Sequence, residues 1–173
     1  LTAQESFSLD RESVSLAAEL TAAFAKELGF SVEEHPFPRA GSGLVVSRET
    51  GSVSAPIGFV AHLDTVHPAG SFPDSLKPAP EGGLYGPGIV DCKGGVAVAL
   101  LAMYALKELG FSRPLRLLLT PDEEVSNRLT GDDGIAFLQS HVKDCAAAFV
   151  CECGKRDEAV VGRKGITKVR VDI

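Results

Sequence analysis

The chain has 173 residues, of which 45% are hydrophobic, and it carries 17 basic against 23 acidic side chains, a formal net charge of −6. This length suits one domain with a single core, and the excess of acid provides no extended positive surface for nucleic acid. No apolar run reaches the roughly 18 residues that a membrane-spanning helix needs. We therefore expect a globular protein that binds a small molecule or a short peptide, and neither nucleic acid nor a membrane.

Four cysteines lie in the second half of the chain, at positions 92, 145, 151 and 153. They are too few for a disulfide framework, so the composition favours a cytoplasmic protein. Cys151 and Cys153 form a Cys-x-Cys pair without a second pair. This favours ordinary buried cysteines over a thiolate zinc site.

The first predicted element is an amphipathic helix over residues 13–28, which Gly29 ends. Its large apolar side chains recur at helical spacing: Leu16, Leu20, Phe24 and Leu28. Short apolar, β-branched runs at residues 44–46 and 57–60 then predict strands. The alternation of helical and extended patterns continues along the chain and indicates an α/β fold.

The middle of the chain begins with residues 68–88, which hold five of the ten prolines and five glycines. This composition predicts an irregular loop that crosses the top of the sheet. Residues 94–109 are apolar almost all round, which predicts a buried helix packed on the sheet. A strand over residues 114–119 and a helix over 133–142 follow.

Further strands are predicted over residues 147–150 and 159–161. The last segment, 168–173, alternates apolar and charged side chains, as a half-buried strand does. Because a domain rarely ends in the middle of a strand, we expect the natural protein to continue beyond Ile173.

Four polar clusters stand at or just beyond the ends of predicted strands, where open α/β sheets place their ligand sites. The first cluster is His62-Leu63-Asp64. Residues two apart on an extended backbone point to the same side, so Asp64 can accept the imidazole N–H of His62 while the other ring nitrogen faces a metal. Taken alone, a His-x-Asp pair is more often a coincidence at a strand end.

The second cluster centres on Asp91, between a glycine-rich loop and the helix predicted from Gly94. The spacing of Gly86 and Gly88 resembles a dinucleotide-binding loop, but no third glycine follows at the required place, which excludes that interpretation. The Asp91 carboxylate can instead bridge two metal ions, and Gly94 and Gly95 let backbone pack closely beneath it. The alternative is that Asp91 merely caps the helix.

The third and fourth clusters are Asp122-Glu123-Glu124 and Glu152. Adjacent side chains point in different directions, which permits Glu124 to bind a metal while Glu123 acts as a general base. A solvated acidic turn is the alternative. Glu152 interrupts an apolar run, so a metal could neutralise it there, although exposure at the strand end is equally consistent.

In their order and spacing, the four clusters resemble the signature of one family of two-zinc hydrolases. The matching segments are His62-Leu63-Asp64-Thr65-Val66, Gly86-Pro87-Gly88 with Asp91 and Lys93-Gly94-Gly95, Asp122-Glu123-Glu124, Glu152, and Gly162-Arg163-Lys164-Gly165. The family contains aminoacylase, acetylornithine deacetylase, succinyl-diaminopimelate desuccinylase and carboxypeptidase G. The resemblance runs from about Val60 to the C-terminus. Cys153 departs from it, because relatives commonly have proline there.

The resemblance implies a three-layer αβα catalytic domain with a central mixed, mainly parallel sheet. It also implies two zinc ions, for which Co²⁺ or Mn²⁺ could substitute. One zinc would be held by His62, Asp91 and Glu152, and the other by Asp91, Glu124 and a histidine beyond Ile173. Asp64 would orient His62, and Glu123 would be the general base.

By the same resemblance, residues 1–165 would belong to the catalytic domain, and residues 166–173 would form the first strand entering a lid and dimerisation domain that this chain lacks. The complete enzyme would be a homodimer. It would hydrolyse an amide bond in N-acyl amino acids or short peptides with a free carboxylate, while this chain alone would be inactive. A non-catalytic metal-binding homologue is the alternative, and the retained Glu123 argues against it.

Overall fold

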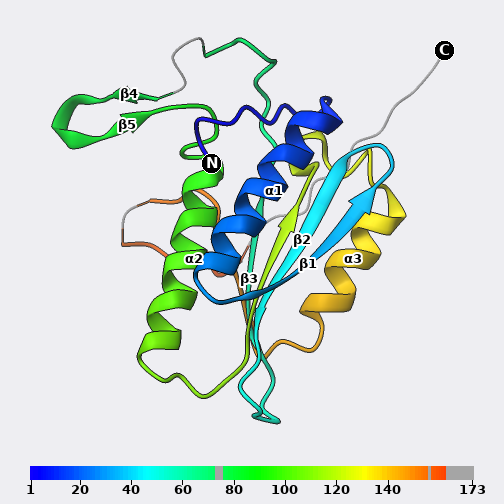
Figure 1. The fold of residues 1–173 in the computed structure, drawn as a ribbon, viewed down its shortest axis with the longest axis vertical. Helices are drawn as coiled ribbons and strands as arrows, with labels where there is room; N and C mark the ends of the chain where they lie inside the picture. Colours follow the sequence, from blue (N-terminus) through cyan, green and yellow to red (C-terminus); the bar gives the residue numbers. More distant parts are fainter. Residues whose placement is uncertain (73–75, 156, 163–173) are drawn as a thin grey trace.

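The computed structural model describes residues 1–72, 76–155 and 157–162 (Figure 1). The elements in chain order are α1 (Arg11–Glu27), β1 (Ser31–Phe37), β2 (Gly41–Arg48), β3 (Ile57–His62), β4 (Lys77–Pro78), the 3-10 turn η1 (Pro80–Gly82), β5 (Leu84–Tyr85), α2 (Lys93–Glu108), β6 (Leu115–Thr120), the 3-10 turn η2 (Glu123–Val125), α3 (Asp132–Val142) and β7 (Ala147–Val150). Helices α1 and α2 cover one face of the main sheet and α3 covers the other. The predicted three-layer αβα class is confirmed.

The main sheet has the strand order β1-β2-β6-β3-β7. Strand β2 pairs antiparallel with both β1 and β6, whereas β3 pairs parallel with both β6 and β7. Four of the five strands therefore point in one direction, and the sheet is mixed, as expected. The carboxyl ends of β3, β6 and β7 consequently lie together at one end of the sheet.

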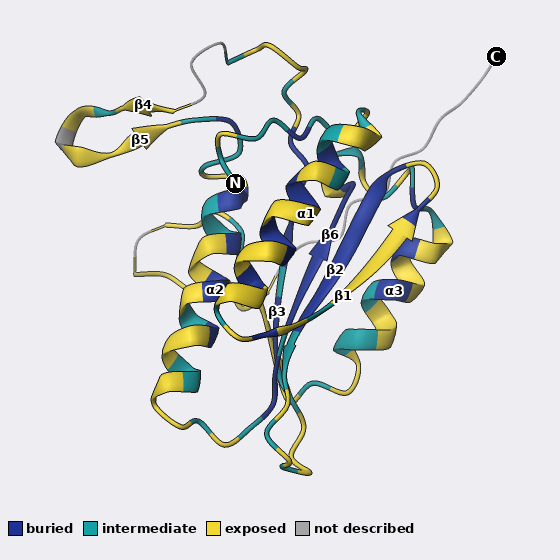
Figure 2. Ribbon diagram, in the orientation of Figure 1, coloured by how far each residue is buried: buried dark blue, intermediate teal, exposed yellow. Residues whose placement is uncertain are grey.

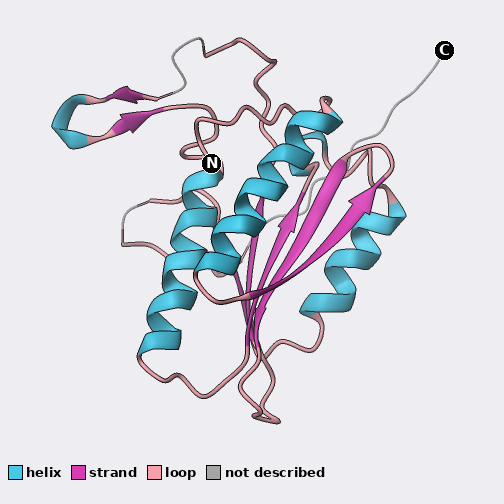
Figure 3. Cartoon of the chain, in the orientation of Figure 1, coloured by secondary structure: helices cyan, strands magenta, loops and turns pink. Residues whose placement is uncertain are grey.

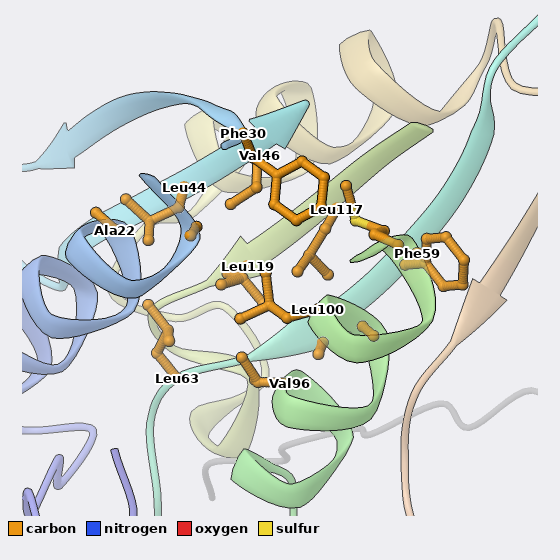
Figure 4. Close-up of a cluster of buried hydrophobic side chains, with 14 of the residues drawn as sticks. Ala22, Phe30, Leu44, Val46, Phe59, Leu63, Val96, Leu100, Leu117 and Leu119 are labelled. Carbon is orange, nitrogen blue, oxygen red and sulfur yellow. The ribbon is translucent and has the colours of Figure 1, made fainter. Parts of the chain in front are cut away.

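The core follows the alternation of side chains along the central strands. Leu115, Leu117 and Leu119 of β6 are fully buried in the layer beneath α1 and α2 (Figures 2 and 4). Leu118 points to the opposite face and packs with Phe137 of α3. A strand segment buried on both faces is apolar at successive positions, which explains the run Leu117–Leu119.

Helix α1 faces the sheet with small side chains and not with its large ones. Its buried residues are Val14, Ala17, Ala18, Thr21, Ala22 and Ala25. The predicted apolar stripe is on the outside, since Leu16, Leu20 and Phe24 are 43–45% exposed. The helix approaches β2 so closely that a Cβ at Gly41 would lie 3.1 Å from the Arg11 carbonyl oxygen. At that separation only small side chains fit between helix and sheet.

Three other expectations were wrong or incomplete. Strand β1 was not predicted, because its sequence is polar; it lies at the sheet edge, where its exposed side chains and Pro36 are tolerated. The loop 68–88 contains the β4–β5 hairpin around η1 (Figure 3). Residues 159–161 form no strand in the described structure.

Helix α2 is apolar all round but not buried all round. Val98 and Leu101 are 63% and 57% exposed, because no described residues cover the outer side of the helix. The predicted strand 168–173 and the domain boundary at 165/166 lie outside the described residues. Within the described part of the chain, no helix has the length and apolarity required to span a membrane.

Candidate metal centre

All four predicted clusters meet at the end of the sheet where the parallel strands have their carboxyl ends. β3 ends at His62, β6 is followed by η2, and β7 is followed by Glu152. Asp91 reaches the same place from the loop that precedes α2. The topology thus gathers side chains that are up to 90 positions apart in the sequence.

His62 lies at the middle of the cluster and is only 1% exposed. Its Nε2 atom is 2.9 Å from Asp91 Oδ1, 3.4 Å from Glu152 Oε1 and 4.0 Å from Glu123 Oε2. Its Nδ1 atom is 3.0 Å from the Asp64 carbonyl oxygen and 3.3 Å from Asp64 Oδ1. Because these oxygens accept, Nδ1 carries a proton and Nε2 is directed at the acidic side chains.

The Asp64 carboxylate is fully buried and does more than the sequence predicted. It accepts the backbone N–H of Glu123 at 3.1 Å and that of Glu124 at 3.2 Å. It also accepts the hydroxyl of Ser8 at 2.6 Å. Asp64 therefore contacts both His62 and the two backbone N–H groups at the start of η2.

The electrostatics of the cluster favour a bound cation. Burial and the charge of Asp91 raise the pKa of Glu124 to about 7, and burial also raises the pKa of Glu152. Burial alone would lower the pKa of His62, but hydrogen bonds with Asp64 and Cys92 raise it to about 12. Several carboxylates around one imidazole need positive charge, which a proton or a metal ion can supply.

The donor set suits zinc, which binds imidazole nitrogen and carboxylate oxygen. Ligand atoms of His62, Asp91 and Glu124 lie within 4.8 Å of one another, and so do those of His62, Cys92 and Glu152. Asp91 and Glu152 both approach the same Nε2 atom of His62. The predicted ligands are thus all present around one position.

Cys92 is close to the cluster, but its side chain packs in the hydrophobic core and contacts the backbone of His62. Its sulfur accepts the backbone N–H of His62 at 3.1 Å and lies 3.4 Å from the His62 carbonyl oxygen. The side chain is fully buried among core residues, and burial raises the pKa of the thiol. Among the described residues, neither Cys151 nor Cys153 joins a potential metal-binding group. The expectation that both are buried is wrong for Cys153, which is exposed, and Cys151 is half-buried.

Two of the alternative interpretations do not hold. Asp91 is not a helix cap, because α2 begins at Lys93 with Cys92 in the capping position and no side-chain capping bond. The acidic trio is not a wholly solvated turn, because Asp122 is fully buried, whereas Glu123 is 56% exposed. Asp122 accepts the backbone N–H groups of Leu129 and Thr130, each at 2.9 Å, and so shapes the turn behind η2.

Close backbone contacts hold Asp91 and Glu152 in place. A Cβ at Gly95 would overlap the carbonyl oxygen of Cys151, and one at Gly94 would overlap that of Ile89. The two glycines therefore let the start of α2 touch both the Asp91 loop and the end of β7. This is the close packing that the sequence predicted for them.

Sequence reasoning missed the N-terminal segment and Lys93. Ser8 contacts Asp64, and the buried Lys93 Nζ donates to the Gln4 carbonyl oxygen. Burial lowers the pKa of Lys93 to about 8. Lys93 was noted only as part of a signature segment, and Ser8 carried no signal, because its partner is 56 positions away.

The other three histidines lie against aromatic rings. His35 and His141 are each 5.2 Å from the ring of Phe137, and His67 is 4.8 Å from that of Phe72.

A hollow of about 690 Å³ opens beside the cluster, and Glu123 and Glu152 are part of its lining. Its remaining lining includes apolar side chains of β3, β7 and α3, among them Val60, Phe149 and Leu138. A hollow of this size can accommodate a small organic ligand.

The curated relatives of this chain include three enzymes. It is 29% identical over 171 residues to carboxypeptidase G2 of Pseudomonas sp. (strain RS-16), which covers 95% of this chain and 40% of the relative. It is 33% identical over 158 residues to succinyl-diaminopimelate desuccinylase of Acidiphilium cryptum, an alignment that covers 84% of this chain and 40% of the relative. It is 32% identical over 126 residues to acetylornithine deacetylase of Salmonella arizonae, with 69% of this chain and 32% of the relative covered. The chain thus spans about 40% of the length of the first two relatives.

Solved structures share the fold. Human carnosine dipeptidase 1 superposes with a TM-score of 0.69 at 18% identity, over 86% of this chain and 36% of that one. A metallo-carboxypeptidase from Sulfolobus solfataricus superposes with a TM-score of 0.70 at 16% identity, over 88% and 36%. Residues 58–173 match the model of the family described as peptidase family M20/M25/M40. Because this match covers all four clusters, the chain belongs to the peptidase family M20/M25/M40, a family of metal-dependent hydrolases.

Proposed function

We propose that the protein carrying this chain hydrolyses an amide bond in N-acyl amino acids or short peptides with a free carboxylate. The observation that carries this proposal is the convergence of Asp91, Glu152 and Glu123 on the Nε2 atom of His62. The names of the relatives, a carboxypeptidase, a desuccinylase and a deacetylase, support the same class of reaction.

Two zinc ions would be shared among the predicted ligands. His62, Asp91 and Glu152 would hold the first, and Asp91 and Glu124 would contribute to the second. The bridging role of Asp91 is supported by its place between His62 and Glu124. When bound, the metal ions would polarise the scissile carbonyl and lower the pKa of water.

Glu123 is the general base in this proposal. Its carboxylate is 56% exposed, lies 4.0 Å from His62 Nε2 and lines the hollow. It can therefore reach a water molecule beside the substrate, remove a proton and pass that proton to the leaving amine. Its backbone is held by Asp64, so the side chain starts from a fixed point.

The alternative is a metal-binding homologue without catalytic activity. The position of Glu123 favours the enzyme, because a carboxylate that only balanced charge would not need to face the hollow.

We also propose a cytoplasmic location, since all four cysteines are free thiols. The homodimer expected from the family resemblance stays a prediction.

The test is Glu123→Gln in the protein that carries this chain, assayed on a panel of N-acyl amino acids and dipeptides. We expect kcat to fall by at least about 10²-fold while the zinc content stays unchanged. Glu108→Gln is a matched control, because Glu108 is equally exposed at 56% but lies at the end of α2. Retained activity with full zinc content would assign the base to another residue, and a wild-type protein without zinc would reject the proposal.

A further inference from the structure

The N-terminal segment Gln4–Ser8 runs beside the residues that follow β3. Thr65 donates its backbone N–H to the Ser6 carbonyl oxygen at 2.8 Å, and Ser8 donates its own to the Thr65 carbonyl oxygen at 3.0 Å. Phe7 and Thr65 thus form a parallel bridge. Because residues two apart on an extended strand point the same way, Ser6 and Ser8 share one side of the segment.

The two serines are equally buried but have different partners. Ser6 is 0% exposed, and its hydroxyl donates to the Leu63 carbonyl oxygen at 2.7 Å. Ser8 is 1% exposed, and its hydroxyl donates to Asp64 Oδ2 at 2.6 Å. Both hydroxyls tie the segment to the end of β3, yet only that of Ser8 bonds to the carboxylate behind His62.

We propose that Ser8 is a positioning residue of the metal centre and acts by fixing the orientation of the Asp64 carboxylate. This inference rests on the proposed function. The Ser8 contact is the shortest that Asp64 makes, whereas Glu123 N, Glu124 N and His62 Nδ1 lie 3.1, 3.2 and 3.3 Å away. Short hydrogen bonds from a hydroxyl to a carboxylate are strong and directional.

The orientation matters because each Asp64 oxygen has its own task. Oδ1 faces His62 Nδ1 and the N–H of Glu123, while Oδ2 receives the N–H of Glu124. Rotation about the Cβ–Cγ bond of a free aspartate meets little resistance. If the carboxylate turned, His62 and the start of η2 would both lose alignment.

The same segment reaches the second cluster. The Gln4 carbonyl oxygen accepts Lys93 Nζ, two residues after Asp91. The segment therefore braces the loops that carry His62 and Asp91 together. Within this segment, only Ser8 contacts the carboxylate behind His62, and it contributes no ligand of its own.

The test compares Ser8→Ala with Ser6→Ala in this chain. We expect Ser8→Ala to weaken zinc affinity by about 10-fold, the lower end of the range for residues behind metal ligands. It should also change the visible absorption spectrum of the Co²⁺-loaded chain. Ser6→Ala removes an equally buried hydrogen bond and should lower Tm similarly, but it should leave the affinity and the spectrum unchanged. Ser8→Thr, which keeps the hydroxyl, should restore most of the affinity.

A second readout needs no metal. In the metal-free chain, Ser8→Ala should speed the amide hydrogen exchange of Glu123 and Glu124, because the Asp64 carboxylate can then turn and hold these N–H groups less firmly, whereas Ser6→Ala should not. Unchanged exchange in Ser8→Ala, or equal losses of zinc affinity in the two alanine variants, would overturn the positioning role. Absence of zinc from the wild-type protein that carries this chain would instead reject the proposed function, and the exchange rates would still decide whether Ser8 holds Asp64.

Discussion

Asp64→Asn tests the arrangement of the site most directly, because it keeps the shape of the side chain and changes its chemistry. Asp64 offers acceptors to donors from Ser8, Glu123, Glu124 and His62. Asparagine has only one acceptor oxygen, and its amide group donates. Whichever way the amide turns, one backbone N–H of η2 faces another donor.

The less costly orientation follows from Ser8. Its hydroxyl can donate to the Thr65 carbonyl oxygen, 3.1 Å away, and accept from an amide group at the Oδ2 position. The N–H of Glu124 then has no acceptor. An unsatisfied buried donor costs about 1–3 kcal/mol, so the free energy of unfolding of the metal-free chain should fall by about that amount.

Zinc affinity should fall as well. The Nδ1–H of His62 keeps its bond to the Asp64 carbonyl oxygen at 3.0 Å but loses the negative charge of the carboxylate 3.3 Å away, which leaves Nε2 less basic. We expect a loss of about 10- to 100-fold, or about 1.4–2.7 kcal/mol. Urea unfolding of the metal-free chain and zinc titration against a chromophoric chelator measure the two effects.

Asp122→Asn is the matched control for this substitution. Asp122 is equally buried at 0% exposure, but its side chain bonds to Leu129 and Thr130. It should lower stability with a smaller loss of zinc affinity. If Asp64→Asn kept wild-type zinc affinity, the orienting role of Asp64 would be refuted. If it also kept wild-type stability, the hydrogen bonds described above would be wrong.

Other consequences of the geometry can be measured separately. Gly95→Ala should lower both the free energy of unfolding and the zinc content, because the new Cβ overlaps the Cys151 carbonyl oxygen and displaces Glu152. A normal zinc content by elemental analysis would contradict this prediction. In the protein that carries the chain, affinity for the second zinc should fall as the pH is lowered from about 8 to about 6, because Glu124, whose pKa burial and Asp91 raise to about 7, must release a proton before it binds this ion. Glu124→Gln should reduce the slope of this profile, and an unchanged slope would argue against this ligand. The chain itself should bind at most one zinc tightly and show no useful turnover, because among its described residues the second position has only Asp91 and Glu124. Two tightly held ions would require a new ligand assignment. In the protein that carries the chain, Asp91→Ala should remove both ions and Glu124→Ala chiefly one, and two ions in the Asp91 variant would exclude the bridge.

The sequence by itself determined the class of the fold and the identity of the cluster. The leucine run of β6 and the apolar run of β3 predict strands buried on both faces, and parallel strands of this kind end at one edge. Polar residues placed directly after such strands must then meet. Local patterns placed His62, Glu123 and Glu152 at strand ends, and the family resemblance assigned them to one site.

The tertiary structure decided which side chains face the sheet. The spacing of Leu16, Leu20 and Phe24 correctly predicts a helix, but the closeness of α1 to β2 selects the alanine face for burial. The polar strand β1 forms because β2 offers a free edge for pairing. Neither the distance between two layers nor the presence of a free edge is encoded in a local pattern.

The tertiary structure also decided the roles of residues that support the site. Asp122 and Glu123 are neighbours of the same charge type, yet one is buried against the 129–130 turn and the other faces the hollow. Ser8 and Asp64 meet across 56 positions of sequence. A hydrogen bond needs its partners within about 3 Å and at a suitable angle, and only the folded arrangement of the N-terminal segment, β3 and η2 sets these quantities.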